Sequence, residues 1–131
     1  MVRVLNALRS VLPGLICGGL LLAASSASAA DAAQGRQTFA QQCAICHTAS
    51  KGGSTLVGPN LFGVVGRHAG AMAGFAYSPA IKGSGLTWTD ATLSAFLQGP
   101  AKMLPGVRMP FAGLKNPTQL NDVVAYLNTL R

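Results

Sequence analysis

The pentapeptide Cys43-Ala44-Ile45-Cys46-His47 constrains this chain more than any other feature of its sequence. Cys-x-x-Cys followed directly by His is the attachment pattern of c-type haem. In that chemistry the two thiols add to the two vinyl groups of a protoporphyrin, and the adjacent His is held under the ring with one nitrogen facing the iron. Cys-x-x-Cys alone also occurs in zinc sites and redox dithiols. The adjacent His47 and a Met further along favour the haem, so we expect the chain to fold around a covalent cofactor.

The first thirty residues have the three parts of a secretory signal peptide. Arg3 and Arg9 give a positively charged start, residues 11–24 are largely apolar, and Ala27-Ser28-Ala29 is a small-x-small cleavage site. A retained membrane anchor is the alternative reading. However, the apolar run is shorter than the roughly 20 residues that span a bilayer, and no charges follow it as a stop signal. We therefore expect residues 1–30 to be removed on export to the periplasm, and a membrane-anchored protein if they are retained.

Residues 31–131 are enough for one domain with one core. Cys17 lies in the signal peptide, so both remaining cysteines belong to the haem pattern and no disulfide framework is expected. Within this region the eight Lys and Arg residues outnumber the three Asp residues by five. This excess is spread along the chain rather than gathered in a run or a helical stripe, so nucleic acid is not an expected partner. A solvated surface or an acidic redox partner accounts for the charge.

Helix signals dominate the mature region, and strand signals are scarce. A segment rich in turn residues, with no hydrophobic period, separates the first two expected helices. A second loop with three prolines precedes the last helix. The expected helices cover residues 31–44, 78–82, 89–98 and 116–130, and the expected loops cover residues 50–74 and 98–111.

Capping residues define the ends of the two clearest helices. Thr89 can cap the third helix and Gly99 ends it. Asn116 can cap the last helix, Pro117 suits its first turn, and Gln119 can close a capping box. The last helix also carries a core-facing stripe at spacings of three and four, made of Leu120, Val123, Val124, Leu127 and Leu130. The fold class that these patterns predict is all-α.

An iron held by one His needs a sixth ligand, and Met109 is the best candidate. It lies between Arg108 and Pro110 in a proline-flanked loop, which lowers the chain entropy of a segment that must hold a thioether against a metal. His68 is the alternative sixth ligand, although a lone His in a loop is usually a surface residue. Spacing and flanking residues favour Met109 without excluding His68.

Taken together, these stretches resemble class I cytochrome c, close to the mitochondrial type and its bacterial periplasmic counterparts. They follow the family's order and spacing over residues 32–130. The matching stretches are Gly35-x-x-x-Phe39, Cys43 to His47, Gly58-Pro59-Asn60-Leu61, Gly66-Arg67, Gly74-Phe75-x-Tyr77-Ser78, Gly85-x-x-Trp88, Pro105-Gly106-x-x-Met109-x-Phe111-x-Gly113 and Ala125-Tyr126-Leu127. The resemblance implies a small monohaem fold in which helices wrap around a covalently bound haem c.

The resemblance also assigns the cofactor contacts. Cys43 and Cys46 would carry the thioethers, while His47 and Met109 would be the two axial ligands of the iron. The Pro59 carbonyl would accept a hydrogen bond from the second nitrogen of His47 and so fix the ring.

At the opposite end of the cofactor, the resemblance implies a polar cluster. Tyr77 and Trp88 would hydrogen-bond a buried haem propionate, and Arg67 would compensate its charge, because a buried carboxylate without partners is costly. Phe96, Ile81 and Val107 stand where the family often has polar side chains. These departures predict a drier sixth-ligand side.

An iron with both axial positions filled has no open site for a substrate, so we expect a monomeric one-electron carrier and not an enzyme. Expected partners are redox proteins, such as a quinol-oxidising complex, a terminal oxidase, a dehydrogenase or a photosynthetic reaction centre. Lys51, Lys102 and Arg108 flank the haem-binding segments and are candidate rim charges. Two alternatives remain at this point: a haem subunit docked permanently on an oxidoreductase, and a sensor or enzyme with a displaceable Met.

Overall fold

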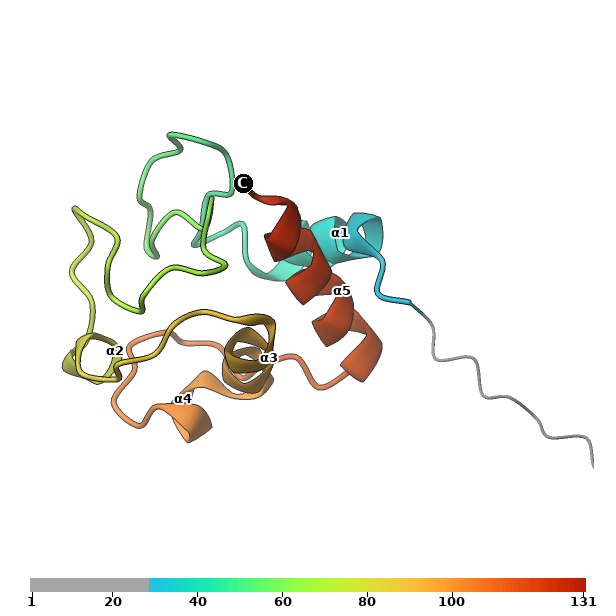
Figure 1. Ribbon diagram of the computed structural model, residues 1–131. Helices are drawn as coiled ribbons and strands as arrows, with labels where there is room; N and C mark the ends of the chain where they lie inside the picture. The colour runs from blue at the N-terminus through green and yellow to red at the C-terminus, as the bar shows by residue number, and fades with distance from the viewer. Residues whose placement is uncertain (1–28) are drawn as a thin grey trace, which may run out of the picture.

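The computed structural model describes residues 29–131, so the predicted signal peptide lies outside the described residues except for its last two positions (Figure 1). In this part of the chain all regular elements are helices, apart from one isolated bridge between His68 and Thr87. The all-α prediction is confirmed. The helices are α1 (Ala32–Gln42), α2 (Pro79–Lys82), α3 (Asp90–Gln98), α4 (Pro100–Met103) and α5 (Pro117–Thr129).

Most helices begin where the sequence places a cap. The Asp31 side chain accepts from the N–H groups of Ala33 and Gln34 at the start of α1. Thr89 and Thr92 form a reciprocal capping box on α3. These bonds satisfy N–H groups that have no partner within the helix.

The caps of α2 and α5 follow the same rule. The Ser78 side chain accepts from the Ile81 N–H. Asn116 caps α5 through the N–H groups of Thr118 and Gln119. No bond returns from the Gln119 side chain within residues 29–131, so the box predicted there is wrong.

Helices α1 and α5 cross at one side of the molecule (Figure 1). Gly35 makes the close approach possible, because a Cβ at this position would overlap the backbone carbonyl of Asp122. Phe39 packs on Tyr126 with ring centroids 5.3 Å apart. The crossing fixes the end of α1, and the Cys-x-x-Cys-His segment follows directly.

Two boundaries differ from the predictions. The first helix ends at Gln42. There the N–H groups of Cys43 and Ala44 both bond the Phe39 carbonyl, so the Ala44 bond spans five residues and the regular four-residue pattern stops. The expected loop over residues 98–111 contains α4, which begins with Pro100 at its first position. Gly99, Pro100 and the later prolines are turn signals and favour a loop here, although proline also suits the first turn of a helix.

The core lies between the α1–α5 crossing and the α3 region. It contains Phe39, Val64, Ile81, Trp88, Leu93, Phe96, Leu97, Leu114, Leu120, Val123, Val124, Leu127 and Leu130. Four of the five residues in the predicted α5 stripe are buried within that helix, and Leu130 is buried at its cap. No helix within residues 29–131 is long and apolar enough to cross a membrane.

Candidate haem-binding site

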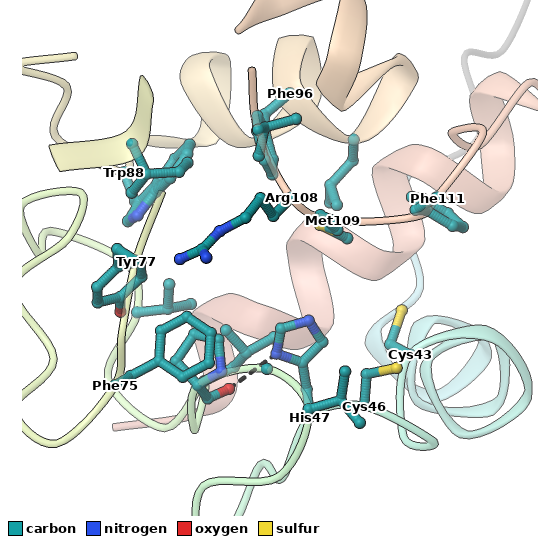
Figure 2. A pocket seen from close by; sticks show the side chains of 18 of the residues that line it. Cys43, Cys46, His47, Phe75, Tyr77, Trp88, Phe96, Arg108, Met109 and Phe111 are labelled. Atoms are coloured by element: carbon teal, nitrogen blue, oxygen red, sulfur yellow. Dashed lines mark hydrogen bonds between the residues drawn. The ribbon is translucent and has the colours of Figure 1, made fainter. Parts of the chain in front are cut away.

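A cavity of about 510 Å³ opens between the helices and the long loops. This volume falls within the range of cofactor sites, roughly 300–1,000 Å³. All eight residues that the sequence analysis assigned to the cofactor line this one cavity: Cys43, Cys46, His47, Pro59, Arg67, Tyr77, Trp88 and Met109. Figure 2 shows the two cysteines at one end of the cavity, with Tyr77 and Trp88 at the other.

The two thiols sit on a tight turn that follows α1. The Cys46 and His47 N–H groups both bond the Cys43 carbonyl, at 3.0 and 2.9 Å. Both cysteines are free thiols. Burial, and secondly the neighbouring Cys46, raises the pKa of Cys43 to about 11. Redox dithiols depend on a lowered thiol pKa, so this environment does not suit disulfide exchange.

The imidazole of His47 is held by two neighbours. Its Nδ1 lies 2.8 Å from the Pro59 carbonyl oxygen, which can only accept a hydrogen bond, so Nδ1 carries the proton (Figure 2). A Cβ at Gly58 would overlap the ring, so only glycine lets the chain pass this close. Burial lowers the pKa of His47, while the bond to Pro59 acts in the opposite direction. A neutral ring protonated on Nδ1 leaves the Nε2 lone pair available to a metal.

Asn60 anchors the loop that carries Pro59. This residue is 5% exposed, and its amide nitrogen lies within 3.0 Å of three oxygens, those of the Thr48 hydroxyl and the Ser50 and Gly53 carbonyls. Its side-chain oxygen accepts from the Phe62 N–H at 2.7 Å. The sequence analysis gave Asn60 no separate role. The Gly-Pro-Asn run was the available signal, because Asn after such a turn often bonds the surrounding backbone.

Met109 lies across the cavity from His47 (Figure 2). It comes from the loop after α4, so the proximal and distal donors approach from different parts of the chain. The alternative donor, His68, does not line the cavity: it is exposed, and its Nδ1 lies 3.0 Å from the Thr87 hydroxyl. Of the methionines in the described region, Met109 alone lines this cavity, since Met72 and Met103 lie elsewhere.

The far end of the cavity carries hydrogen-bond donors and a positive charge. Arg67 donates to the carbonyls of Asn60 and Phe62, at 3.0 and 3.4 Å. Its pKa is lowered by burial, with nearby Tyr77 opposing the shift. Burial raises the pKa of Tyr77, which keeps its hydroxyl protonated. No residue in the described chain accepts a bond from the Trp88 indole N–H, which is therefore available to an acidic group.

The three side chains that depart from the family pattern give the cavity an apolar stretch of wall. Ile81 and Phe96 are 6% and 7% exposed, and both line the cavity together with Val107. Phe96 also packs on Trp88 with ring centroids 5.0 Å apart. Phe96 and Val107 place no hydroxyl or amide on this wall, as a dry sixth-ligand side requires.

Sequence reasoning missed one contact at the mouth of the cavity. Arg108 extends from the Met109 loop (Figure 2). Its guanidinium donates to the Ala76 carbonyl at 2.7 Å. The two residues are 32 positions apart in the chain. Beside them Phe75 packs edge-on against Tyr77, with ring centroids 4.7 Å apart. These contacts join two loops across the opening, and no local pattern around Arg108 indicates them.

An all-α domain built around an apolar cavity, with two thiols, an oriented imidazole and a facing thioether, has the architecture of a c-type haem protein. Comparison with known proteins agrees with that class. The family model for cytochrome c matches residues 32–131. Cytochrome c2 of Blastochloris viridis is 45% identical over 115 residues, which covers 86% of this chain and 90% of that protein.

Two further relatives extend the comparison. Cytochrome c2 of Rhodomicrobium vannielii is 42% identical over 93% of this chain and 97% of its own length. Cytochrome c of the alga Chlamydomonas reinhardtii is 48% identical over 79% of this chain and 92% of its own length. The chain therefore belongs to the cytochrome c family, in class I, whose members are electron carriers with a covalently attached haem c. The cavity, its donor set and its polar end fit that group.

Proposed function

We propose that this protein is an exported one-electron carrier whose iron is bound by His47 and Met109. The observation that carries the proposal is that the eight residues indicated by the haem pattern and by the family resemblance all line one cavity. When bound, haem c supplies an iron that changes its charge by one. The roles argued below belong to the residues of this chain.

Cys43 and Cys46 would attach the cofactor. Each thiol would add its sulfur and its hydrogen across one vinyl double bond, so attachment would need no oxidant and would release nothing. The tight turn after α1 supports this role because it places both sulfurs at the same end of the cavity (Figure 2). The packing of α1 on α5 fixes the end of α1, from which the turn with the two cysteines starts.

His47 and Met109 would complete the coordination. The Pro59 carbonyl, 2.8 Å from Nδ1, keeps the His47 ring in one tautomer with Nε2 toward the cavity. The thioether of Met109, on the opposite wall, supplies the second donor. With both positions filled, no site remains for a substrate, which supports electron transfer rather than turnover.

Arg67, Tyr77 and Trp88 would hold the anionic end of the cofactor. A buried carboxylate needs hydrogen bonds and a compensating charge, and this end of the cavity offers both. Arg67 is itself fixed by the carbonyls of Asn60 and Phe62. Its guanidinium is therefore in place before the cofactor binds.

The mouth of the cavity would be the surface that meets redox partners. Ile45 and Val57 both line the cavity and are 81% and 71% exposed. Arg108 lines the cavity and is exposed, whereas Lys51 and Lys102, the other two candidate rim charges, are exposed but do not line it. A mixed apolar and cationic rim suits a transient complex with a quinol-oxidising complex, an oxidase, a dehydrogenase or a reaction centre.

Export to the periplasm, with loss of residues 1–30, is part of the proposal. The sequence of the signal peptide supports it. The start of the fold supports it as well, because α1 begins at Ala32 and its cap is Asp31, directly after the expected cleavage site. The mature protein would be a monomer.

An absorption spectrum tests the proposal. Protein made with c-type maturation machinery should show a weak near-infrared sulfur-to-iron band when ferric and sharp c-type bands when ferrous. Carbon monoxide should leave the ferrous spectrum unchanged at neutral pH. A missing near-infrared band together with ready carbon monoxide binding would contradict the His47/Met109 pair and favour a sensor or enzyme with an open site.

A further inference from the structure

Asp122 is the one buried acidic residue within residues 29–131. It lies in α5 and is 6% exposed. Its carboxylate accepts a hydrogen bond from the backbone N–H of Asp31 at 2.7 Å, across 91 positions of the chain. No Lys, Arg or His in the described part forms an ion pair with it. A buried carboxylate without a cation is costly, so this single neutral partner calls for an explanation.

The nitrogen that Asp122 binds belongs to a second acidic residue, Asp31. The Asp31 side chain accepts from the Ala33 N–H at 2.8 Å and caps α1. The other ionisable side chains of α1 and α5 are those of Arg36 and Tyr126. Arg36 is exposed, and the Tyr126 ring packs on Phe39. Two acidic residues therefore meet at one amide nitrogen, and Arg36, the cation of these two helices, forms no ion pair with either of them.

We propose that Asp122 is a binding site for the α-ammonium group that signal-peptide removal creates. Processing hydrolyses one peptide bond with one water, leaving a carboxylate on the signal peptide and an ammonium on the mature chain. Cleavage after Ala30 places that ammonium on the nitrogen of Asp31, the atom that Asp122 already binds. Cleavage after Ala29 places it on the nitrogen of Ala30, one residue back along the chain. The inference rests on the export proposed above.

Processing would then strengthen the helix crossing around which the protein folds. Asp122 bonds through its side chain to the start of α1, and its backbone carbonyl lies against Gly35. A positive charge at the start of a helix opposes the helix dipole, so a free ammonium there would weaken α1. The flanking carboxylates of Asp31 and Asp122 reverse that effect. The exported chain is thus more stable than the same chain with residues still attached before Ala30.

A double-mutant cycle tests this inference. The first form is the processed holoprotein, whose first residue is read by intact mass. The second form carries Gly-Ser-Gly-Ser between the signal peptide and Ala30, which moves the ammonium away from Asp122. Asp122→Asn is made in both forms, because Asn keeps an oxygen acceptor and loses the charge. Asp90→Asn is the matched control, since Asp90 is an exposed acid at the start of α3.

At pH 6.5 we expect Asp122→Asn to raise the unfolding constant roughly fivefold more in the processed form than in the extended form. The control should change both forms equally. The ion pair exists only while the amine is protonated, so the excess should vanish at pH 9.5, above the ordinary α-amino pKa of about 7.7–8.0. Should the Asn variant fail to fold, the two wild-type forms carry the test. The processed form should then be the more stable at pH 6.5, and the two should be equal at pH 9.5.

Three results would overturn the inference. One is an equal effect of Asp122→Asn in both forms at both pH values, which would leave Asp122 as an acceptor for an amide only. Another is a mature chain that starts beyond Asp31, and the third is a chain that keeps its signal peptide. The haem spectrum of the same samples reports separately on the electron-carrier proposal, so the two can fail independently.

Discussion

The two sides of the cavity are built in different ways. On the His47 side, the chain bonds to itself at close intervals: the Gly58 N–H donates to the Cys46 carbonyl, and the Leu61 N–H donates to the Thr48 carbonyl, both at 2.8 Å. With the Asn60 amide and the bond from His47 to Pro59, these contacts fix the ring whether or not a metal is present.

The Met109 side has fewer fixed points. Within its loop the backbone bonds are local, from Val107 to Leu104 at 3.0 Å and from Phe111 to Met109 at 2.9 Å. The long-range bonds near this loop are those of the Arg108 side chain to Ala76, of the Leu114 N–H to Leu97 and of the Lys115 side chain to Gln98. The thioether is therefore positioned mainly by packing, so under stress we expect the protein to lose Met109 from the iron before it loses His47.

Removing the distal donor should have the largest effect. Met109→Ala leaves an apolar wall with no group that can reach the iron, since His68 lies outside the cavity. We expect the near-infrared band to disappear and the affinity of the ferrous protein for carbon monoxide to rise by a factor of 100 or more, equivalent to roughly 3 kcal/mol. The fold should persist, because the His47 side does not depend on Met109.

Met103→Ala is the control for that variant. Met103 is half-buried but does not line the cavity, so its removal should leave the near-infrared band and carbon monoxide binding unchanged. Tight carbon monoxide binding by the wild-type protein, equal to that of Met109→Ala, would show that the distal side is already open.

Removing the Asn60 side chain, which holds the loop that carries Pro59, should have the next largest effect. This effect should be on stability and not on ligand binding. Asn60→Ala removes the amide that bonds Thr48, Ser50 and Gly53, and it leaves the Phe62 N–H without its acceptor. Losing a buried hydrogen-bond network of this kind costs about 3 kcal/mol. Denaturant unfolding of the holoprotein measures the loss.

Asn121→Ala is the matched change on the exposed surface of α5, and we expect it to shift stability by less than about 0.5 kcal/mol. If Asn60→Ala is as mild as this control, the His47 loop is held by the cofactor and not by its own bonds. The contrast between the two sides would then be lost.

The sequence predicts the parts of this molecule that depend on neighbouring residues. Thr89 and Asn116 cap their helices as expected, because a cap needs only the N–H groups of the next turn. The haem pattern is equally local, and from it the cofactor follows. Contacts between distant segments are different: Arg108 meets Ala76, and Asp31 meets Asp122, only after the loops and the α1–α5 crossing have formed. The helix α4 is not predicted because Gly99 and Pro100 are turn signals in the sequence, although proline also suits the first turn of a helix.

We expect the smallest effect from removing the Arg108 side-chain bond, which crosses the cavity mouth. Arg108→Ala removes the donor to the Ala76 carbonyl, a charge-assisted bond in an exposed position. Because this bond ties the Met109 loop to the Phe75–Tyr77 loop, its loss should speed displacement of Met109 by imidazole a few-fold, while stability changes little. Stopped-flow mixing of ferric protein with imidazole measures the rate. Arg108→Lys keeps a cationic donor of similar reach and should stay near the wild-type rate at neutral pH. If Arg108→Ala and Arg108→Lys give the same rate, packing alone holds the Met109 loop. The Met109 side would then depend on hydrogen bonds even less than the Arg108 bond suggests, and it would differ more from the His47 side.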